Sequence, residues 1–170
     1  YSNFLKKKDF ERQLKLFNNS GLINDAKELI LESNKFILTF DDGFKDHIYA
    51  AESLKKFNAI GIFAIPTLPF KNKDILDVHK IHLITGKIKG LDIMNELKKY
   101  ITQNKIKNFI NENEKKKYKV AYKAHKDDSH KKEFKKIMNY YSDIKLKRKI
   151  LNYLLKKFDI NIKYKDFYLN

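Results

Sequence analysis

The sequence predicts an α/β protein in which one strand–helix–strand unit is followed by a long helical stretch. Two short apolar runs end at turn residues, an amphipathic segment lies between them, and helical periodicity takes over after Pro69. A strand, a helix and a strand within about 30 residues form a βαβ unit, so the strands should be parallel with a right-handed crossover. The length of 170 residues favours one domain over two.

The two predicted strands, residues 36–40 and 61–65, are continuous apolar runs rich in Phe and Ile. Each run is short and stops at a chain breaker, the first at Asp41-Asp42-Gly43 and the second at Pro66. Apolar runs without polar alternation are typical of strands covered on both faces, so both strands are predicted to be buried.

The helix predicted between the strands covers residues 47–57. Asp46 is expected to cap its N-terminus, and Asn58 is expected to end it. The helical spacing of its apolar side chains predicts one buried stripe, which consists of Ile48, Ala51, Leu54 and Phe57.

Helical periodicity predicts further helices at residues 8–17, 75–84, 91–101, 131–141 and 144–158. Two of these have a clear apolar side, with Leu91, Met94, Leu97 and Ile101 in one and Ile144, Leu151, Leu154 and Phe158 in the other. Asn24 is expected to cap a short helix through Ile30. The polar segment 105–129 is ambiguous, and residues 161–169 are expected to form a short strand or an extended tail.

The chain is strongly basic, with 37 Lys and Arg against 21 Asp and Glu and a formal net charge of +16. Such a charge suggests nucleic acid or another anionic polymer as a partner. Only Arg12 and Arg148 are arginines, however, and arginine supplies the bidentate contacts that nucleic-acid readers favour. We therefore expect a solvated lysine surface and no specific nucleic acid, with a basic non-enzymatic binding module as the alternative.

Composition excludes several classes of protein. Because the chain has no cysteine, it has no disulfide framework and no thiolate nucleophile or metal ligand. No apolar run approaches the roughly 18 residues of a membrane span, so no transmembrane segment is expected. The sequence favours neither a cytoplasmic nor a cell-envelope location.

The segment Leu38-Thr39-Phe40-Asp41-Asp42-Gly43 is the one that points to chemistry. Its two carboxylates stand at the carboxyl end of a predicted strand, where α/β folds place their active sites. Adjacent carboxylates repel each other, and a bound cation relieves that repulsion, which suits a metal ligand beside a general base. The residues alone leave a second interpretation open, in which the pair begins a loop and caps the next helix.

This segment and its surroundings resemble the NodB-type polysaccharide deacetylases, carbohydrate esterase family 4. Thr39-Phe40-Asp41-Asp42-Gly43 matches the first motif of the family, and Phe44-Lys45-Asp46-His47 follows it. The segment 61–67, Gly-Ile-Phe-Ala-Ile-Pro-Thr, resembles the ATFFIPT-like segment of the family. Phe10-Glu11-Arg12-Gln13-Leu14 resembles the helix that precedes the motif in many members. The resemblance covers residues 9–67 and extends more weakly to the later helices, which are similar to an insertion found in a bacterial branch.

The resemblance implies a fold, a reaction and roles for two residues. The fold would be a partial distorted (β/α) barrel, a single incomplete domain over residues 1–170 with a large helical insertion at 70–160. The reaction would be the metal-dependent hydrolysis of N-acetyl groups on a polysaccharide or glycan. Asp41 would act as the general base, and Asp42 would bind a divalent metal, usually zinc.

The chain departs from the family pattern at the other metal ligands. The family takes two histidines from an H-[ST]-x-x-H motif, and this sequence contains no such motif. Its five histidines are His47, His79, His82, His125 and His130. His79 and His82 are one helical turn apart and are candidates for a metal contact, with packing as the alternative, whereas His125 and His130 are five residues apart in a polar segment.

Later family motifs, an Arg-x-Pro segment and a distal Leu-x-His, are also missing. The resemblance therefore implies the N-terminal portion of a deacetylase domain, weak or inactive by itself. An incomplete barrel leaves a sheet edge and apolar faces uncovered, which predicts marginal stability or self-association. A phosphatase of the haloacid dehalogenase kind also places Asp after a strand but requires Asp-x-Asp, and Asp41 and Asp42 are adjacent.

Overall fold

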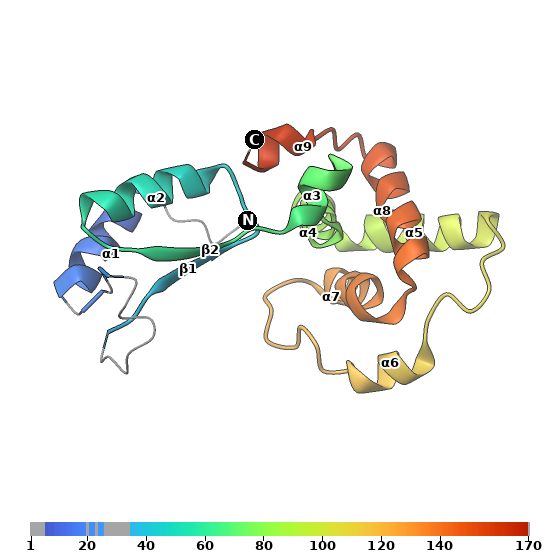
Figure 1. Cartoon of the computed structure of the whole chain (residues 1–170). Coiled ribbons are helices and arrows are strands. Elements are labelled where there is room, and N and C mark those ends of the chain that lie inside the picture. Colours follow the sequence, from blue (N-terminus) through green and yellow to red (C-terminus); the bar gives the residue numbers. More distant parts are fainter. Residues whose placement is uncertain (1–5, 20, 23, 26–34, 170) are drawn as a thin grey trace. The chain divides into compact units, whose positions relative to one another are not determined.

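The computed structural model describes residues 6–19, 21–22, 24–25 and 35–169, which fold into two compact units (Figure 1). We call Tyr1–Asp74 with Ile162–Asn170 the sheet unit, and Ile75–Asn161 the helical unit. The predicted α/β class is confirmed, and helix predominates over strand in the described residues.

The sheet unit contains the predicted strand–helix–strand arrangement. Strand β1 (Leu38–Asp41) pairs in parallel with β2 (Gly61–Ala64), and α2 (Asp46–Lys56) connects them. Leu38 lies opposite Gly61, and Asp41 lies opposite Ala64, so both strands end at the same edge. The prediction of two parallel strands is therefore confirmed.

The prediction that both strands are buried on both faces was wrong. Leu38, Phe40 and Phe63 are partly buried on one face of the sheet, where the Phe40 and Phe63 rings stack with centroids 4.7 Å apart. On the other face the side chains are exposed, including Ile62 at 45%. A continuous apolar run shows that a strand is hydrophobic, but it does not show whether other elements cover one face of the sheet or both.

Helix α1 (Lys7–Asn19) packs on the covered face, as its apolar spacing predicts. Leu14 is fully buried in a cluster with Leu22, Leu54 and Ala59. Phe10 contacts Phe40 edge-on, which joins the helix to β1. The helix predicted from Asn24 to Ile30 lies outside the described residues.

Helix α2 has the predicted extent but a different buried face. Ala50, Ser53 and Leu54 are buried, whereas Ile48 is 56% exposed. Asp46 is not the N-cap, because Lys45 holds that position with helical dihedrals and no side-chain hydrogen bond. The turn after β1 already has helical geometry when it reaches Lys45, so Asp46 is the first residue of the helix.

The sheet unit is completed by α3 (Thr67–Asn72) and α9 (Tyr164–Phe167). Residues 161–169 were expected to form a strand or an extended tail. Instead, one helical turn precedes a single antiparallel bridge between Tyr168 and Phe44. Tyr164 and Tyr168 both contact Phe70 of α3, and this aromatic packing favours the turn over a free tail.

The helical unit contains α4 (Asp77–Lys87), α5 (Gly90–Gln103), α6 (Glu112–Lys117), α7 (Ser129–Lys136), the π-helix η2 (Ile137–Tyr141) and α8 (Ile144–Lys157). Its core is made of fully buried apolar side chains, among them Ile84, Ile93, Phe134, Leu151 and Leu154. No helix in the part of the chain that the structure describes is long and apolar enough to cross a membrane.

Two apolar stripes predicted in this unit are shifted. Leu91 and Ile144 are exposed, whereas Ile93 and Ile150 occupy the core. The helix predicted at 131–141 changes to π geometry at Ile137, and this carries the Tyr141 carbonyl to the amide of Asn111, 2.9 Å away.

Candidate functional site

Asp41 and Asp42 stand at the carboxyl end of β1, where the sequence predicts them. Asp41 is the last residue of the strand and is exposed, opposite Ala64 of β2. The backbone N–H of Asp42 donates to the carbonyl of the same Ala64 at 2.9 Å, which continues the ladder one residue further. Both carboxylates therefore start from a backbone position that the parallel pairing defines.

The turn after the strand is conformationally unusual. Asp42 has φ of 80° and Gly43 has φ of 64°, so two consecutive residues are left-handed. Such a conformation is strained for Asp and natural for Gly. A Cβ at Gly43 would also lie 3.0 Å from Cγ2 of Ile65. Glycine is thus required here both by φ and by the close approach of the chain after β2.

Residues from the C-terminal end of the chain hold this turn. The N–H of Leu169 donates to the Gly43 carbonyl at 3.0 Å, and the N–H of Lys45 donates to the Phe167 carbonyl at 3.2 Å. Tyr168 is fully buried and its ring is parallel to that of Phe44, with centroids 6.0 Å apart. The Asp-Asp-Gly turn is therefore held both by the end of β2 and by residues 167–169.

His47 is a titratable side chain that packs beside the Asp-Asp-Gly turn. Its ring lies among Phe40, Phe44 and Phe63, with centroid distances of 5.7, 5.7 and 5.8 Å. Its Nδ1 is buried and has no hydrogen-bond partner among the described residues. Burial lowers the pKa of His47, against the opposing charges of Asp42, Asp46 and Asp41. The imidazole is therefore kept neutral beside the carboxylates at neutral pH.

The described residues do not by themselves fit a zinc ion. A catalytic zinc takes three protein ligands. Within the described residues, no group of three or more His, Asp or Glu side chains is placed to hold a metal. Asp42 is the ligand that the resemblance assigns, and the turn supplies it without two histidines to accompany it.

His79 and His82 lie on α4 of the helical unit, whereas Asp41 and Asp42 belong to the sheet unit. His79 is 2% exposed, among the core residues of its helix. The pKa of His82 is lowered by burial and by the positive charge of Lys135. The structure therefore places His79 in the core of the helical unit and His82 near the positive charge of Lys135.

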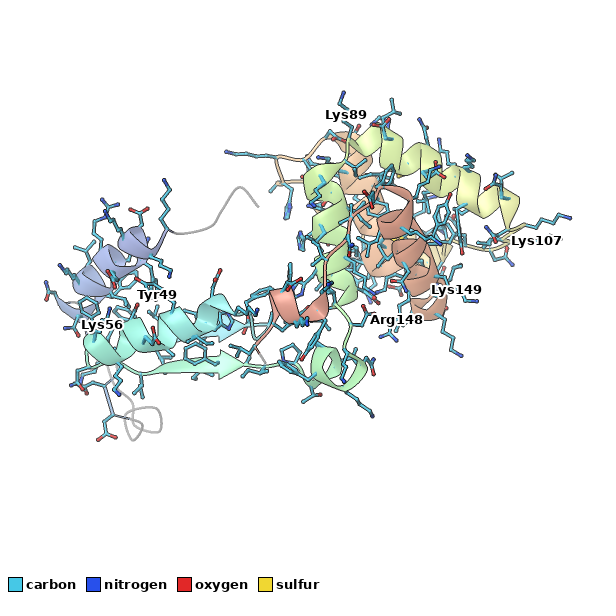
Figure 2. The ribbon with its side chains drawn as sticks, turned by 90° about the horizontal axis from the view of Figure 1, so that it is seen from above. Tyr49, Lys56, Lys89, Lys107, Arg148 and Lys149 are labelled. Carbon is cyan, nitrogen blue, oxygen red and sulfur yellow. The ribbon has the colours of Figure 1, made fainter. Side chains whose placement is uncertain are left out.

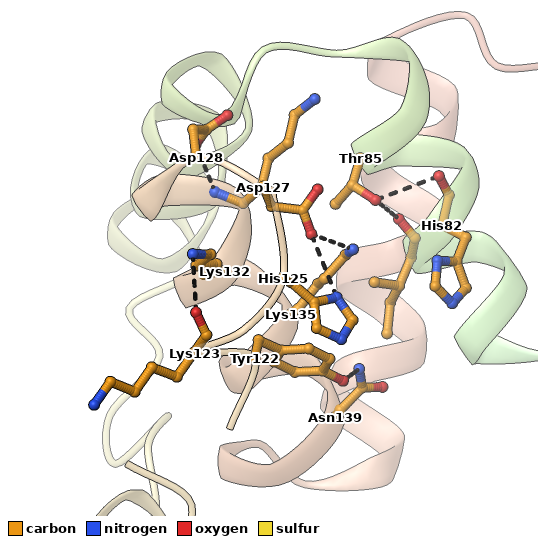
Figure 3. Close-up of polar contacts among 12 residues, drawn as sticks. His82, Thr85, Tyr122, Lys123, His125, Asp127, Asp128, Lys132, Lys135 and Asn139 are labelled. Carbon is orange, nitrogen blue, oxygen red and sulfur yellow. Dashed lines mark hydrogen bonds and ion pairs between the residues drawn. The ribbon is translucent and has the colours of Figure 1, made fainter. Parts of the chain in front are cut away.

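His125 lies near a partly buried ion pair (Figure 3). Lys135 Nζ contacts Asp127 Oδ2 at 2.6 Å, and His125 Nδ1 is 3.9 Å from the same oxygen. Burial would raise the pKa of Asp127, but the hydrogen bond and charge of Lys135 outweigh it, and the pKa is lowered. His130 Nδ1 is 4.0 Å from Asp128 Oδ1. Asp127 and Asp128 thus neighbour these histidines.

A surface cavity of about 360 Å³ lies at the other end of the strands, lined by Leu54, Gly61 and Phe63 among others. Gly61 is the first residue of β2, so the cavity opens at the end of the strands opposite to the one that carries Asp41. It does not belong to the candidate site.

Sequence reasoning missed the contributions of His47 and Tyr168. The position of His47 in the sequence could have predicted its place, because it follows the motif closely at the start of α2. Tyr168 had no local signal, since its contacts with Phe44 and Phe70 join distant parts of the chain.

Comparison with protein-family models finds no match, and comparisons with curated proteins and with solved structures find none either.

Proposed function

We propose that this chain carries the N-terminal part of a NodB-type polysaccharide deacetylase domain, which hydrolyses N-acetyl groups on a glycan. The observation that carries the proposal is the Asp41-Asp42-Gly43 turn at the carboxyl end of a parallel strand. The two strands would be the first part of the distorted (β/α) barrel, and the helical unit would be its insertion.

Asp41 is the general base in this proposal. It would accept a proton from the water whose oxygen bonds to the acetyl carbonyl carbon. That proton must then reach the amide nitrogen as the C–N bond breaks, so that acetic acid and the sugar amine leave. Its exposure and its position at the end of β1 support this role. His47 adds no competing positive charge at neutral pH, because burial lowers its pKa.

Asp42 is the metal ligand in this proposal, and the described residues provide no further set of ligands around it. Two histidine ligands would have to come from residues outside this chain. Reading the codons downstream of Asn170 for an in-frame H-[ST]-x-x-H motif tests that requirement, and a stop codon directly after Asn170 would count against it.

Acetate release from an N-acetylated glycan by the protein expressed from its complete gene tests the proposed activity. We expect Asp41→Asn to lower kcat by about 100-fold or more, as for the loss of a general base. Asp42→Ala should abolish release that added zinc supports. Asp46→Asn is the matched control, because Asp46 is nearby but outside the motif. Equal rates in all variants would contradict the proposal.

A further inference from the structure

The positive charge of the chain is concentrated in one unit. Ile75–Asn161 contains 23 Lys and Arg against 10 Asp and Glu, a net charge of +13. The remaining residues contain 14 against 11, a net charge of +3. A general preference for lysine would raise both units alike. The excess on the helical unit therefore indicates a partner, and Figure 2 shows Lys89 and Lys107 directed outward from this unit.

Within the helical unit, residues 118–128 form a loop that is fastened to α7. Lys136 Nζ donates to the Lys119 carbonyl at 2.9 Å, and Lys132 Nζ donates to the Lys123 carbonyl at 3.4 Å (Figure 3 shows the second bond). At the start of the loop, the Tyr118 ring stacks on Tyr140 with centroids 4.2 Å apart. Inside the loop, Asn139 Nδ2 donates to the Tyr122 hydroxyl at 2.7 Å in a part-buried contact. This bond and the Tyr118–Tyr140 stack hold the loop against η2, and the two exposed lysine bonds add to them.

The anchored part of the loop presents an aliphatic side chain to solvent. Val120 lies between the two anchors and is 71% exposed, the largest value among the exposed large hydrophobic residues of the described chain. Lys119 and Lys123 on either side of it are exposed as well. An apolar tip flanked by lysines on an ordered loop has no role in the packing of the unit.

The acidic side chains near the loop are mostly engaged. Asp127 pairs with Lys135, and Glu112 pairs with Lys115. Asp128 accepts the Lys131 N–H as the cap of α7. By contrast, five exposed lysines form no salt bridge with any described residue, and these are Lys116, Lys117, Lys119, Lys123 and Lys126. Of these, Lys117 lies over the Tyr118 ring. Their charge is available to an anionic partner.

Two features favour a lipid surface over nucleic acid. Arg148, the one arginine of the unit, is 3.3 Å from Asp77, and Tyr118 and Tyr122 pack towards Tyr140 and are only partly exposed. Nucleic-acid binding favours arginine forks and open aromatic platforms. An anionic membrane surface attracts clustered lysines without requiring arginine, and an apolar side chain beside them can enter the headgroup boundary.

We propose that the 118–128 loop, together with the adjoining end of α6, docks on a surface of acidic phospholipid. Val120 enters the headgroup boundary, and Lys116 of α6 contacts the headgroup charges together with Lys119 and Lys123 of the loop. This attachment is independent of the proposed deacetylase activity.

Co-sedimentation of the full chain with vesicles tests the docking surface. Wild-type protein should bind vesicles of phosphatidylglycerol mixed with phosphatidylcholine, and binding to phosphatidylcholine alone should be weak. Replacing Lys116, Lys119 and Lys123 by Gln should lower the partition coefficient about 100-fold, roughly fivefold for each lysine. The matched control replaces Lys87, Lys98 and Lys99 of α4 and α5 by Gln, which removes the same charge elsewhere and should have a much smaller effect.

Val120→Ser separates a membrane from other anionic partners. It should lower vesicle binding about tenfold while leaving circular dichroism and thermal unfolding unchanged. Equal loss in the two lysine triples would show diffuse attraction and overturn the proposal. Vesicle binding insensitive to Val120→Ser, together with tight binding to duplex DNA, would assign the surface to nucleic acid and overturn it as well.

Discussion

The sheet unit and the helical unit differ in how they use their residues. The sheet unit has a two-stranded sheet covered on one face, leaves Ile62 and Ile65 exposed, and carries a net charge of only +3. The helical unit has a core of fully buried side chains from α4, α5, α7 and α8, and carries a net charge of +13. The unit with the thinner packing is the one that carries the paired carboxylates.

In the sheet unit, a few backbone hydrogen bonds and one aromatic contact hold the candidate site in the absence of a deep core. The Asp41-Asp42-Gly43 turn is fixed by backbone hydrogen bonds to Ala64 and Leu169 and by the aromatic contact of Tyr168 with Phe44. In the helical unit, packing of buried side chains fixes the positions of the helices, and lysines occupy the exposed positions. The comparison predicts that changes at the turn and changes in the helical core act on separate units.

The largest effect is expected from Tyr168→Ala. Tyr168 is fully buried, so its truncation should cost the sheet unit about 3–5 kcal/mol of unfolding free energy, the range for a buried aromatic side chain. Hydrogen exchange should become faster at β1 and its turn and stay unchanged in α4 and α8. Tyr168→Phe, which keeps the ring, is the control. Equal loss of protection in both units would show that they unfold as one and would break the comparison.

A smaller effect is expected from Gly90→Ala in the helical unit. A Cβ at Gly90 would collide with the Asp128 carboxylate, which caps α7 by accepting the Lys131 N–H. Displacing this cap should cost about 1 kcal/mol in denaturant unfolding. Gly86→Ala is the matched control, because a Cβ there meets no atom within 4 Å and should stabilise α4 by up to about 1 kcal/mol. A loss of stability in the control would contradict this account of the helical unit.

The smallest expected effect is the pH dependence of the free energy of unfolding, to which one histidine contributes in each unit, His47 and His82. Burial lowers the pKa of His47 in the sheet unit and of His82 in the helical unit. A histidine with a lowered folded pKa stabilises the fold above its unfolded pKa of about 6.5, and this stability is lost as pH falls below that value. Three aspartates oppose the shift at His47. At His82 the positive charges of Lys135, His79 and His125 reinforce the shift and Asp127 alone opposes it, so the helical unit should lose more.

Unfolding monitored separately in each unit between pH 7 and pH 5 measures this difference. His82→Gln should flatten the pH dependence of the helical unit, and His47→Gln should flatten that of the sheet unit. An unchanged pH profile in both variants would show that other groups control the response to acid.

The elements that the sequence predicts well are those with local signals. Two apolar runs stopped by Asp-Asp-Gly and by Pro66 are sufficient for the parallel βαβ unit, and periodicity places α1, α5 and α8 within a few residues. The position of Asp41 and Asp42 at the carboxyl end of β1 follows from the same signals.

The features that the sequence does not predict depend on distant contacts. Which side of α2 is buried depends on where the core lies, so Ile48 was assigned to the wrong face. The turn at α9 depends on aromatic contacts of Tyr164 and Tyr168 with Phe70. The loop around Val120 contacts α7 and η2 through residues distant in sequence, including Lys136 and Asn139. No local pattern encodes such contacts.

We propose that the two units have separate tasks, hydrolysis at the Asp41-Asp42 turn and attachment through the 118–128 loop. The most direct test measures acetate release from a soluble N-acetylated glycan and vesicle binding on the same two variants of the protein from its complete gene. We predict that Asp41→Asn loses acetate release and keeps vesicle binding, and that the Lys116, Lys119 and Lys123 triple variant does the reverse. Loss of both properties in either variant, or of neither in both, would contradict the account.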